Sequence, residues 1–293
     1  MSLHELAIVV LSALLHAAWS VSIKGSRDPL AFNVLQTLPN VALAATLVPF
    51  VRFDEIPTAL WPLLLGTSVA HAFYFYWMSR AYQLADLSLV YPIARSTPAF
   101  LPLAAVLLLG ERISALGALG IATVVVGMWL VHVGLGLRLR AFLSPGTLFA
   151  YLTLGATVVY GLLDKRAMMV LEAATWTSPL PRAVFFYFAL VVGHGILFVP
   201  LALQRVEPGV LGALARSQWR RVAAAIGFTF ASYGLILEAL RTAPVSYVVA
   251  ARQVSVLFVV GMSVLWLGES PSRARMLGAG LTVAGVALLA LAK

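Results

Sequence analysis

The chain alternates between long apolar runs and short polar segments, and this pattern predicts its secondary structure. A helix that crosses a membrane needs about 20 mostly apolar residues. Ten runs approach that length, and they cover approximately residues 4–24, 30–51, 58–80, 86–109, 113–133, 146–164, 180–203, 220–240, 244–267 and 274–292. Most of the connections between these runs are only a few residues long. We therefore expect an all-α integral membrane protein with ten transmembrane helices.

The second half of the chain resembles the first. When residues 81–130 are shifted by 158 positions onto residues 239–288, sixteen pairs are identical, and a Leu-Gly-Glu tripeptide falls at the same point of both copies. Five helices per copy is an odd number, so the second copy must enter the membrane in the opposite orientation. The sequence predicts two inverted five-helix repeats, residues 1–133 and 146–293, which are joined by a linker at 134–145 and surround a central cavity.

Composition excludes several classes of protein. The chain is 61% hydrophobic and only 11% charged, whereas about a quarter of the residues are charged in soluble proteins. The net charge of +9 comes from Lys and Arg that lie singly or in pairs between apolar runs, where they meet lipid headgroups, so we expect no nucleic-acid partner. The absence of cysteine excludes disulfides and thiol chemistry, and no zinc, hydrolase or phosphate-binding motif is present. We expect no cofactor, no metal and no enzymatic activity.

The N-terminus begins directly in an apolar run, without a basic segment or a cleavage site, so we interpret this run as a retained first helix. Lys and Arg are more frequent on the odd-numbered loops than on the termini and even-numbered loops. By the rule that positive charge stays inside, this bias places the odd-numbered loops in the cytoplasm.

Several short motifs occur once in each half. The first helix of each half carries a small-aromatic-small stretch that ends in lysine, Ala18-Trp19-Ser20 to Lys24 and Val159-Tyr160-Gly161 to Lys165. An Ala-Xaa-Xaa-Xaa-Ala turn precedes the fourth and ninth helices, and glycines recur along the fifth and tenth. In this order the motifs resemble the drug/metabolite transporter superfamily, in its ten-helix EamA-type branch, and the resemblance covers essentially the whole chain.

The resemblance implies ten helices, cytoplasmic termini, and export of small metabolites across the inner membrane. Its cytoplasmic termini conflict with the charge bias of the loops. The aromatic third helix is similar to that of amino-acid exporters, aromatic amino-acid exporters among them. Efflux of drugs or other metabolites is the alternative, and a channel or a membrane enzyme is a more distant one.

Two arginines lie about ten residues into the predicted fourth and ninth helices. Arg95 and Arg252 are nearly equivalent in the repeat. An arginine at the centre of a membrane helix costs about 2.5–3.5 kcal/mol on insertion scales, so each must face protein or water. One interpretation is that they bind a carboxylate of the substrate; the other is that they bind carbonyl groups of a helix broken near Pro92 and Pro98. The ninth helix has no interior proline, so we expect the two helices to differ mechanically.

Further candidates for substrate binding follow helical spacing on other predicted helices. Rigid aromatic walls with a few polar groups suit a partly apolar ligand, although aromatic residues of this kind also face lipid. The histidines could carry protons or could be neutral packing residues. The candidates are His16 and Trp19 on the first helix, His71, Tyr74, Met78 and Tyr82 on the third, Ser88 and Tyr91 on the fourth, Tyr160 on the sixth, Tyr233 on the eighth, and Ser246 and Gln253 on the ninth.

Two further expectations concern charge and packing. Asp164 precedes Lys165 and Arg166 near a predicted helix end, which suggests a solvated local ion pair. Since no predicted helix carries a cluster of carboxylates, facilitated export down a gradient stays open beside proton coupling. Small residues spaced four apart on the fifth and tenth helices allow close packing, which we assign to contacts within a monomer rather than to a dimer.

Overall fold

The computed structural model describes residues 1–293 except 25, 85–86, 134–144, 259–260, 262–271 and 293. It also leaves the side chains of residues 21, 24, 87–89, 91, 132–133 and 145–146 undescribed. The predicted linker lies almost wholly outside the described residues, and so does the second Leu-Gly-Glu tripeptide.

The first half contains α1 (Leu3–Lys24), α2 (Pro29–Leu47), α3 (Leu60–Leu84), α4 (Leu87–Ala94), α5 (Thr97–Leu109) and α6 (Ala115–Val133), with short 3₁₀ turns η1 (Val48–Phe50) and η2 (Phe53–Glu55) after α2. The second half contains α7 (Pro145–Ala173), α8 (Arg182–Leu203), α9 (Val210–Thr242), α10 (Val245–Ala251), the 3₁₀ turn η4 (Arg252–Val254) and α12 (Arg273–Leu291). Among the described residues, seven helical segments are long and apolar enough to cross a membrane, and 115–131 and 245–258 form shorter apolar helices.

Two helices are longer than their apolar runs. α7 continues nine residues beyond the predicted end at 164, and α9 begins ten residues before the predicted start at 220. The added part of α9 is polar, and the helix is kinked where Gln218 adopts non-helical backbone angles. Hydropathy alone could not detect these extensions because helices that leave the apolar layer no longer need apolar side chains.

The predicted fourth and ninth helices are both interrupted at equivalent points. α4 ends at Ala94 and α5 begins at Thr97, so Arg95 lies in the break. α10 ends at Ala251 and the chain tightens into η4, which contains Arg252. The fourth helix is interrupted at Arg95 and Ser96, whereas the proline-free ninth passes through the 3₁₀ turn directly into a further helical segment, so the two interruptions lie at equivalent points but differ in form. A 3₁₀ segment inside a helix often marks a hinge, and here it needs no proline.

Close glycine contacts show that the two repeats are inverted. Gly127 of α6 lies against the Gly278 backbone of α12, and Gly120 lies against the Gly285 backbone. As the numbers rise along one helix they fall along the other, so α6 and α12 are antiparallel. The 158-residue offset converts each of these pairs into the other, as a two-fold axis requires. The small residues pack within the monomer as expected, although the exposed Ala118, Ala122, Gly280 and Ala284 take no part.

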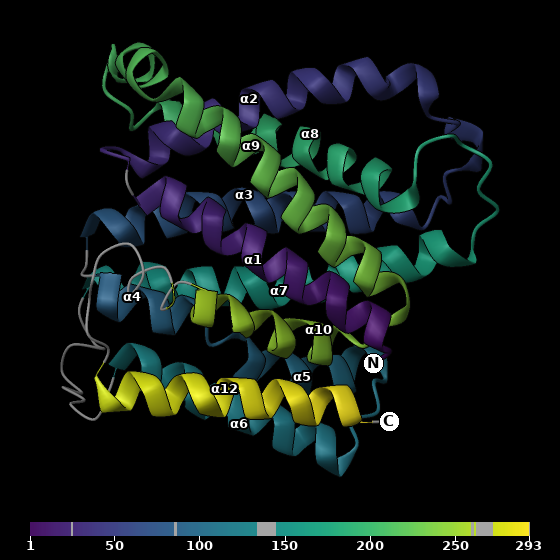
Figure 1. Ribbon diagram of the computed structural model, residues 1–293. Helices are drawn as coiled ribbons and strands as arrows, with labels where there is room; N and C mark the ends of the chain where they lie inside the picture. Colours follow the sequence, from purple (N-terminus) through teal and green to yellow (C-terminus); the bar gives the residue numbers. More distant parts are fainter. Residues whose placement is uncertain (25, 85–86, 134–144, 259–260, 262–271, 293) are drawn as a thin grey trace.

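The remaining helices also pair across the two repeats. α1 packs along α9, and α3 packs along α7. These are the first and eighth predicted helices and the third and sixth. The two pairs are equivalent, because the repeat relates the first helix to the sixth and the third to the eighth. Figure 1 shows α6 and α12 side by side at one edge of the bundle and both chain ends on one side. The Met1 amino group lies 3.5 Å from the Ala292 carbonyl oxygen, as expected for an even number of crossings.

Large apolar side chains cover much of the outer surface, and many polar groups are buried between the helices. Side chains such as Leu65, Leu107 and Leu277 are exposed, whereas Asn33, His71 and other polar groups are buried. This is the distribution expected of a protein surrounded by lipid, because polar groups facing hydrocarbon would lose their hydrogen bonds. The chain is thus an all-helical integral membrane protein of two inverted repeats.

Candidate functional site

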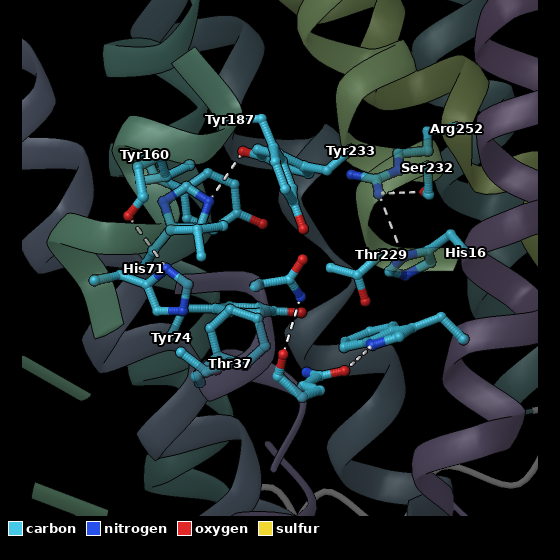
Figure 2. A pocket seen from close by; sticks show the side chains of 17 residues that line it. His16, Thr37, His71, Tyr74, Tyr160, Tyr187, Thr229, Ser232, Tyr233 and Arg252 are labelled. Atoms are coloured by element: carbon cyan, nitrogen blue, oxygen red, sulfur yellow. Dashed lines mark hydrogen bonds between the residues drawn. The ribbon is translucent and has the colours of Figure 1, made fainter. Parts of the chain in front are cut away.

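A cavity lies between the repeats, about midway along the helices. It has two adjoining lobes that share His16, Tyr74, Tyr160, Tyr233 and Arg252. The first lobe contains about 680 Å³ of space when its open mouth and the solvent there are included. Its lining, drawn in Figure 2, comprises His16, Trp19, Gln36, Thr37, Asn40, His71, Tyr74, Phe75, Tyr160, Tyr187, Leu190, Val191, His194, Thr229, Ser232, Tyr233 and Arg252.

Cationic groups meet at one side of the cavity. The broken helices bring both arginines to His16 of α1, whose Nε2 atom contacts Arg95 and whose Nδ1 atom lies 3.3 Å from Nη2 of Arg252. The same Nη2 atom lies 3.4 Å from the Ser232 hydroxyl, and the guanidinium of Arg252 lies over the Tyr233 ring at 5.8 Å from its centroid. Figure 2 shows His16, Ser232 and Arg252 together on the side opposite His71.

This cluster has the chemistry of an anion site. No residue that the structure describes offers a carboxylate ion pair to Arg252, and its buried Nε atom has no protein acceptor. His16 can accept a hydrogen bond at only one nitrogen while it is neutral. Arg252 therefore retains donor capacity for a carboxylate or another anion in the cavity, because its Nε atom has no protein acceptor and a guanidinium group can form two parallel hydrogen bonds.

Aromatic rings form the opposite wall of the first lobe. The His71 ring stacks on Tyr160 with their centroids 4.0 Å apart, and the His194 ring stacks on Phe75 at 5.2 Å. Trp19 lies instead next to His16, with the ring centroids 5.0 Å apart, and is held by a 3.0 Å hydrogen bond from its Nε1 atom to Oε1 of Gln36. A ligand in this lobe would contact rings whose positions are fixed by their neighbours, which favours a flat or apolar group.

Asp164 corrects the expectation of a solvated ion pair. Its side chain is completely buried and lines the second lobe, away from its charged neighbours in sequence. It accepts a 2.5 Å hydrogen bond from the Thr67 hydroxyl and another from the Tyr233 hydroxyl. Lys165 turns the other way, and its Nζ atom donates to the carbonyl groups of Leu240 and Ala243 at the end of α9. Successive residues of a helix point in directions about 100° apart, so adjacent charges need not meet.

The other candidates divide into three groups. Met78 and Gln253 line the second lobe. Tyr82 is absent from the lining of both lobes and packs against a buried apolar cluster that includes Val90 and Ile93. The hydroxyl of Ser246, also outside both lobes, donates to Glu111 at 2.6 Å. The side chains of Ser88 and Tyr91 lie outside the described residues.

A row of polar side chains on one face of α2 also belongs to the site, and none of these residues was among the predicted candidates. Asn33, Gln36, Thr37 and Asn40 are buried, and the last three line the first lobe. Gln36 donates to Asn33 at 2.7 Å, which in turn donates to the Ser79 hydroxyl on α3 at 3.0 Å. Their spacing of three, four and seven residues on an apolar helix was the signal that could have found them. His194 and Tyr187 on α8 also belong to the lining and were not among the predicted candidates.

Comparisons with known proteins agree with this architecture. One crystal structure is similar to the chain with a TM-score of 0.74 over 98% of this chain and 95% of the other, at 18% sequence identity, which supports the shared fold. A comparison with curated proteins finds no match.

The family comparison covers both halves. The model of the EamA-like transporter family matches residues 4–133 and again residues 148–291. Two matches in succession agree with the two repeats seen in the glycine contacts. The chain is therefore a multi-pass membrane protein that belongs to the EamA-like transporter family, a family of small-molecule transporters.

Proposed function

We propose that the protein is a secondary transporter that exports amino acids, aromatic and neutral ones in particular, across the cytoplasmic membrane by alternating access. The observation that carries the substrate class is the pair of arginines on His16. Arg252 has no carboxylate partner among the described residues and faces the cavity, so a substrate carboxylate would supply the missing anion.

The aromatic wall supports the choice among carboxylate-bearing metabolites. Trp19, Tyr74, Phe75 and Tyr160 lie within the same cavity as the arginines. A carboxylate at Arg252 would leave the substrate side chain against these rings, which suits an aromatic or aliphatic amino acid. Phosphorylated substrates would need more cations than the described lining provides.

Unpartnered polar atoms around the cavity also favour a polar ligand. Among the described residues, the Tyr187 hydroxyl, the Asn40 Oδ1, the His194 Nε2 and the Gln253 Oε1 are buried without a protein partner. Each belongs to the lining of one of the lobes. Because an unsatisfied buried polar group costs about 1–3 kcal/mol, a ligand or water that binds there is stabilised.

The same architecture supports alternating access and a monomeric state. The equivalent breaks at Arg95 and Arg252 place hinge-like segments beside the substrate site in both repeats, and an exchange of the two repeat conformations would open the cavity to the opposite side. The glycine faces of α6 and α12 are already occupied by each other, which leaves no need for a dimer there.

Counterflow in proteoliposomes tests the proposal. Vesicles loaded with an unlabelled amino-acid mixture should accumulate labelled phenylalanine or leucine transiently and saturably, because a carrier exchanges substrates whereas a pore does not. Vesicles without protein give the baseline, and size-exclusion chromatography establishes that the protein is folded. Absence of accumulation for every amino acid, with accumulation of cationic drugs instead, would replace the amino-acid proposal with drug efflux.

A further inference from the structure

We propose that Asp164, Tyr233 and His71 together bind the proton that drives transport, so that substrate leaves in exchange for an entering proton. The proposal rests on the proposed function for the direction of transport, but the proton site itself stands on the geometry of the second lobe. From the sequence, His16 and His71 are the candidate proton carriers, and Asp164 is expected to form a solvated ion pair.

The three residues and Thr67 form a closed ring of hydrogen bonds. The Asp164 carboxylate accepts from the hydroxyls of Thr67 and Tyr233. The Tyr233 oxygen lies 3.0 Å from Nε2 of His71. The other ring nitrogen, Nδ1, lies 3.0 Å from the Thr67 carbonyl oxygen and 3.2 Å from its hydroxyl oxygen.

The donors in this ring determine how many protons it holds. A carbonyl oxygen can only accept, so Nδ1 of His71 must carry a hydrogen. When the Tyr233 hydroxyl donates to Asp164, its oxygen can accept only, so Nε2 of His71 must carry a hydrogen as well. With all contacts satisfied, the ring contains an imidazolium and a carboxylate, which is one proton more than neutral His71 with ionised Asp164.

The same extra proton can take a second position in which all the hydrogen-bonded contacts of the ring are kept. The N–H bond at Nε2 of His71 breaks as its hydrogen moves to the Tyr233 oxygen, and the Tyr233 O–H bond breaks as its hydrogen moves to Asp164. The result is a neutral carboxylic acid and a neutral imidazole, joined by the same hydrogen bonds in reverse. Charge is conserved in this transfer, and the proton can therefore enter at one end of the ring and leave at the other.

Loss of the proton breaks one contact of the ring. Neutral His71 then turns an acceptor nitrogen toward the Tyr233 oxygen, whose own hydrogen is donated to Asp164. Two acceptors 3.0 Å apart repel each other, whereas the protonated ring joins them. His71 is on α3 of the first repeat, and Tyr233 is on α9 of the second, so proton release weakens a connection between the repeats that must move during transport.

The ring is surrounded by groups that respond to its charge. Tyr160 of α7 stacks on His71, and Tyr74 of α3 lines the second lobe. The ring centroids of His194, on α8, and His71 are 6.5 Å apart. The guanidinium groups of Arg95 and Arg252 line the same lobe as Asp164. A substrate carboxylate that binds to these guanidinium groups would therefore share one lobe with the proton site. Substrate and proton are thereby linked within one cavity.

Accumulation driven by a pH difference tests the coupling. Proteoliposomes with an acidic interior should concentrate labelled amino acid above its external level, by up to about tenfold per pH unit for one proton exchanged per substrate. Asp164→Asn should abolish this accumulation and should lower counterflow without a pH difference by a much smaller factor, because its side chain also lines the second lobe. Tyr233→Phe keeps the carboxylate but removes the connecting hydroxyl. Since its ring lines both lobes, it should likewise abolish accumulation and reduce counterflow only in part. Glu172→Gln on α7, an exposed partner of Arg241, is the matched control and should behave as wild type.

The outcomes separate the coupling from the proposed function. Wild-type counterflow without any response to the pH difference would overturn the coupling and leave the carrier intact, as would normal pH-driven accumulation by Asp164→Asn. Loss of counterflow in folded Asp164→Asn would assign the carboxylate to substrate binding and overturn the proposal.

Infrared difference spectra, recorded at different pH values, test the proton site without any substrate. A buried carboxyl band that disappears in Asp164→Asn supports the proton site even if amino acids are not the substrate, and identical spectra would overturn it.

Discussion

Gly127 on α6 and Gly278 on α12 approach each other backbone to backbone, without room for a methyl group between them. A Cβ atom added to Gly127 would lie 2.7 Å from the Gly278 carbonyl oxygen, and one added to Gly278 would lie 2.6 Å from the Gly127 carbonyl oxygen. The repeat converts this contact into the one between Gly285 and Gly120. Each glycine is needed because the backbone of the other lies so close, and these contacts hold the two halves in their two-fold arrangement.

We predict that Gly127→Ala destabilises the protein by about 1–3 kcal/mol, the usual cost of overpacking a tight interface. The two backbones cannot yield as a flexible side chain could, so the helices must separate. The measurement is the thermal unfolding midpoint in detergent. Gly280→Ala is the matched control, because a Cβ there meets nothing within 4 Å and alanine is favoured over glycine in a helix. Equal midpoints for both variants would contradict the prediction.

A second prediction concerns the Leu-Gly-Glu tripeptide of the first half. Gly110 ends α5 with left-handed backbone angles (φ 67°), a conformation that glycine adopts without strain. The next residue, Glu111, accepts from the backbone N–H of Val245 at 2.6 Å and from the hydroxyl of Ser246 at 2.6 Å. The tripeptide therefore caps the first turn of α10 in the other repeat.

Glu111→Ala should lower stability by about 0.5–2 kcal/mol, the range for loss of a helix N-cap. Its effect on transport should exceed that of a surface substitution, because α10 leads directly to Arg252. Thermal unfolding and counterflow are measured together. The exposed neighbour Arg112→Ala serves as the control, and an unchanged unfolding midpoint in Glu111→Ala would remove the capping role.

Much of the fold could be predicted because it depends on local patterns. Apolar length gave the helices, and the glycines at 120, 127, 278 and 285 gave both the repeat and its packing. The break at Arg252 could not be predicted in the same way. Proline is the usual sequence signal for a helix interruption, and the second half breaks at the equivalent point without one.

The site was predicted only in part because its contacts join distant segments. Arg95, Arg252 and His16 were recognisable as costly polar groups in apolar runs, but nothing local showed that they meet. The prediction of a solvated ion pair at Asp164 was wrong. It relied on the lysine and arginine that follow Asp164, whereas its hydrogen-bond partners, Thr67 and Tyr233, lie 97 and 69 residues away. Helix rotation and tertiary packing determine such contacts, and neither can be predicted from the neighbouring residues alone.

A third prediction concerns pH and the loops at one end of the bundle. Glu55 accepts hydrogen bonds from the hydroxyl and backbone N–H of Thr177 and from the backbone of Ser178, between the loops that follow α2 and α7. The hydrogen bond from the Thr177 side chain, followed by that from its backbone, lowers the pKa of the Glu55 carboxyl below its ordinary value. The carboxylate is therefore favoured in the folded protein.

A lowered pKa gives stabilisation that is present above the ordinary value, about 4.3, and is lost as pH falls through the lowered value. Glu55→Gln should thus unfold at a lower temperature than wild type at pH 7, and the difference should shrink in acid. Unfolding midpoints measured from pH 7 to pH 3 test this. The exposed neighbour Asp54→Asn should show no such convergence with wild type, and a difference for Glu55→Gln that is independent of pH would contradict the role of its charge.

The last prediction separates charge at the substrate site from charge elsewhere. Arg252→Gln keeps a hydrogen-bonding side chain near Ser232 but removes the cation from the cavity. Hydrogen bonds to charged groups contribute about 1.5–3 kcal/mol, so the substrate concentration at half-maximal counterflow should rise roughly 10- to 100-fold. Arg216→Gln, an exposed arginine on α9, provides the control with the same change in net charge. Amino alcohols, which lack the carboxylate, should be transported equally weakly by wild type and Arg252→Gln. If Arg252→Gln weakened amino acids and amino alcohols to the same degree, the arginine would act on the structure of the cavity and not on the carboxylate.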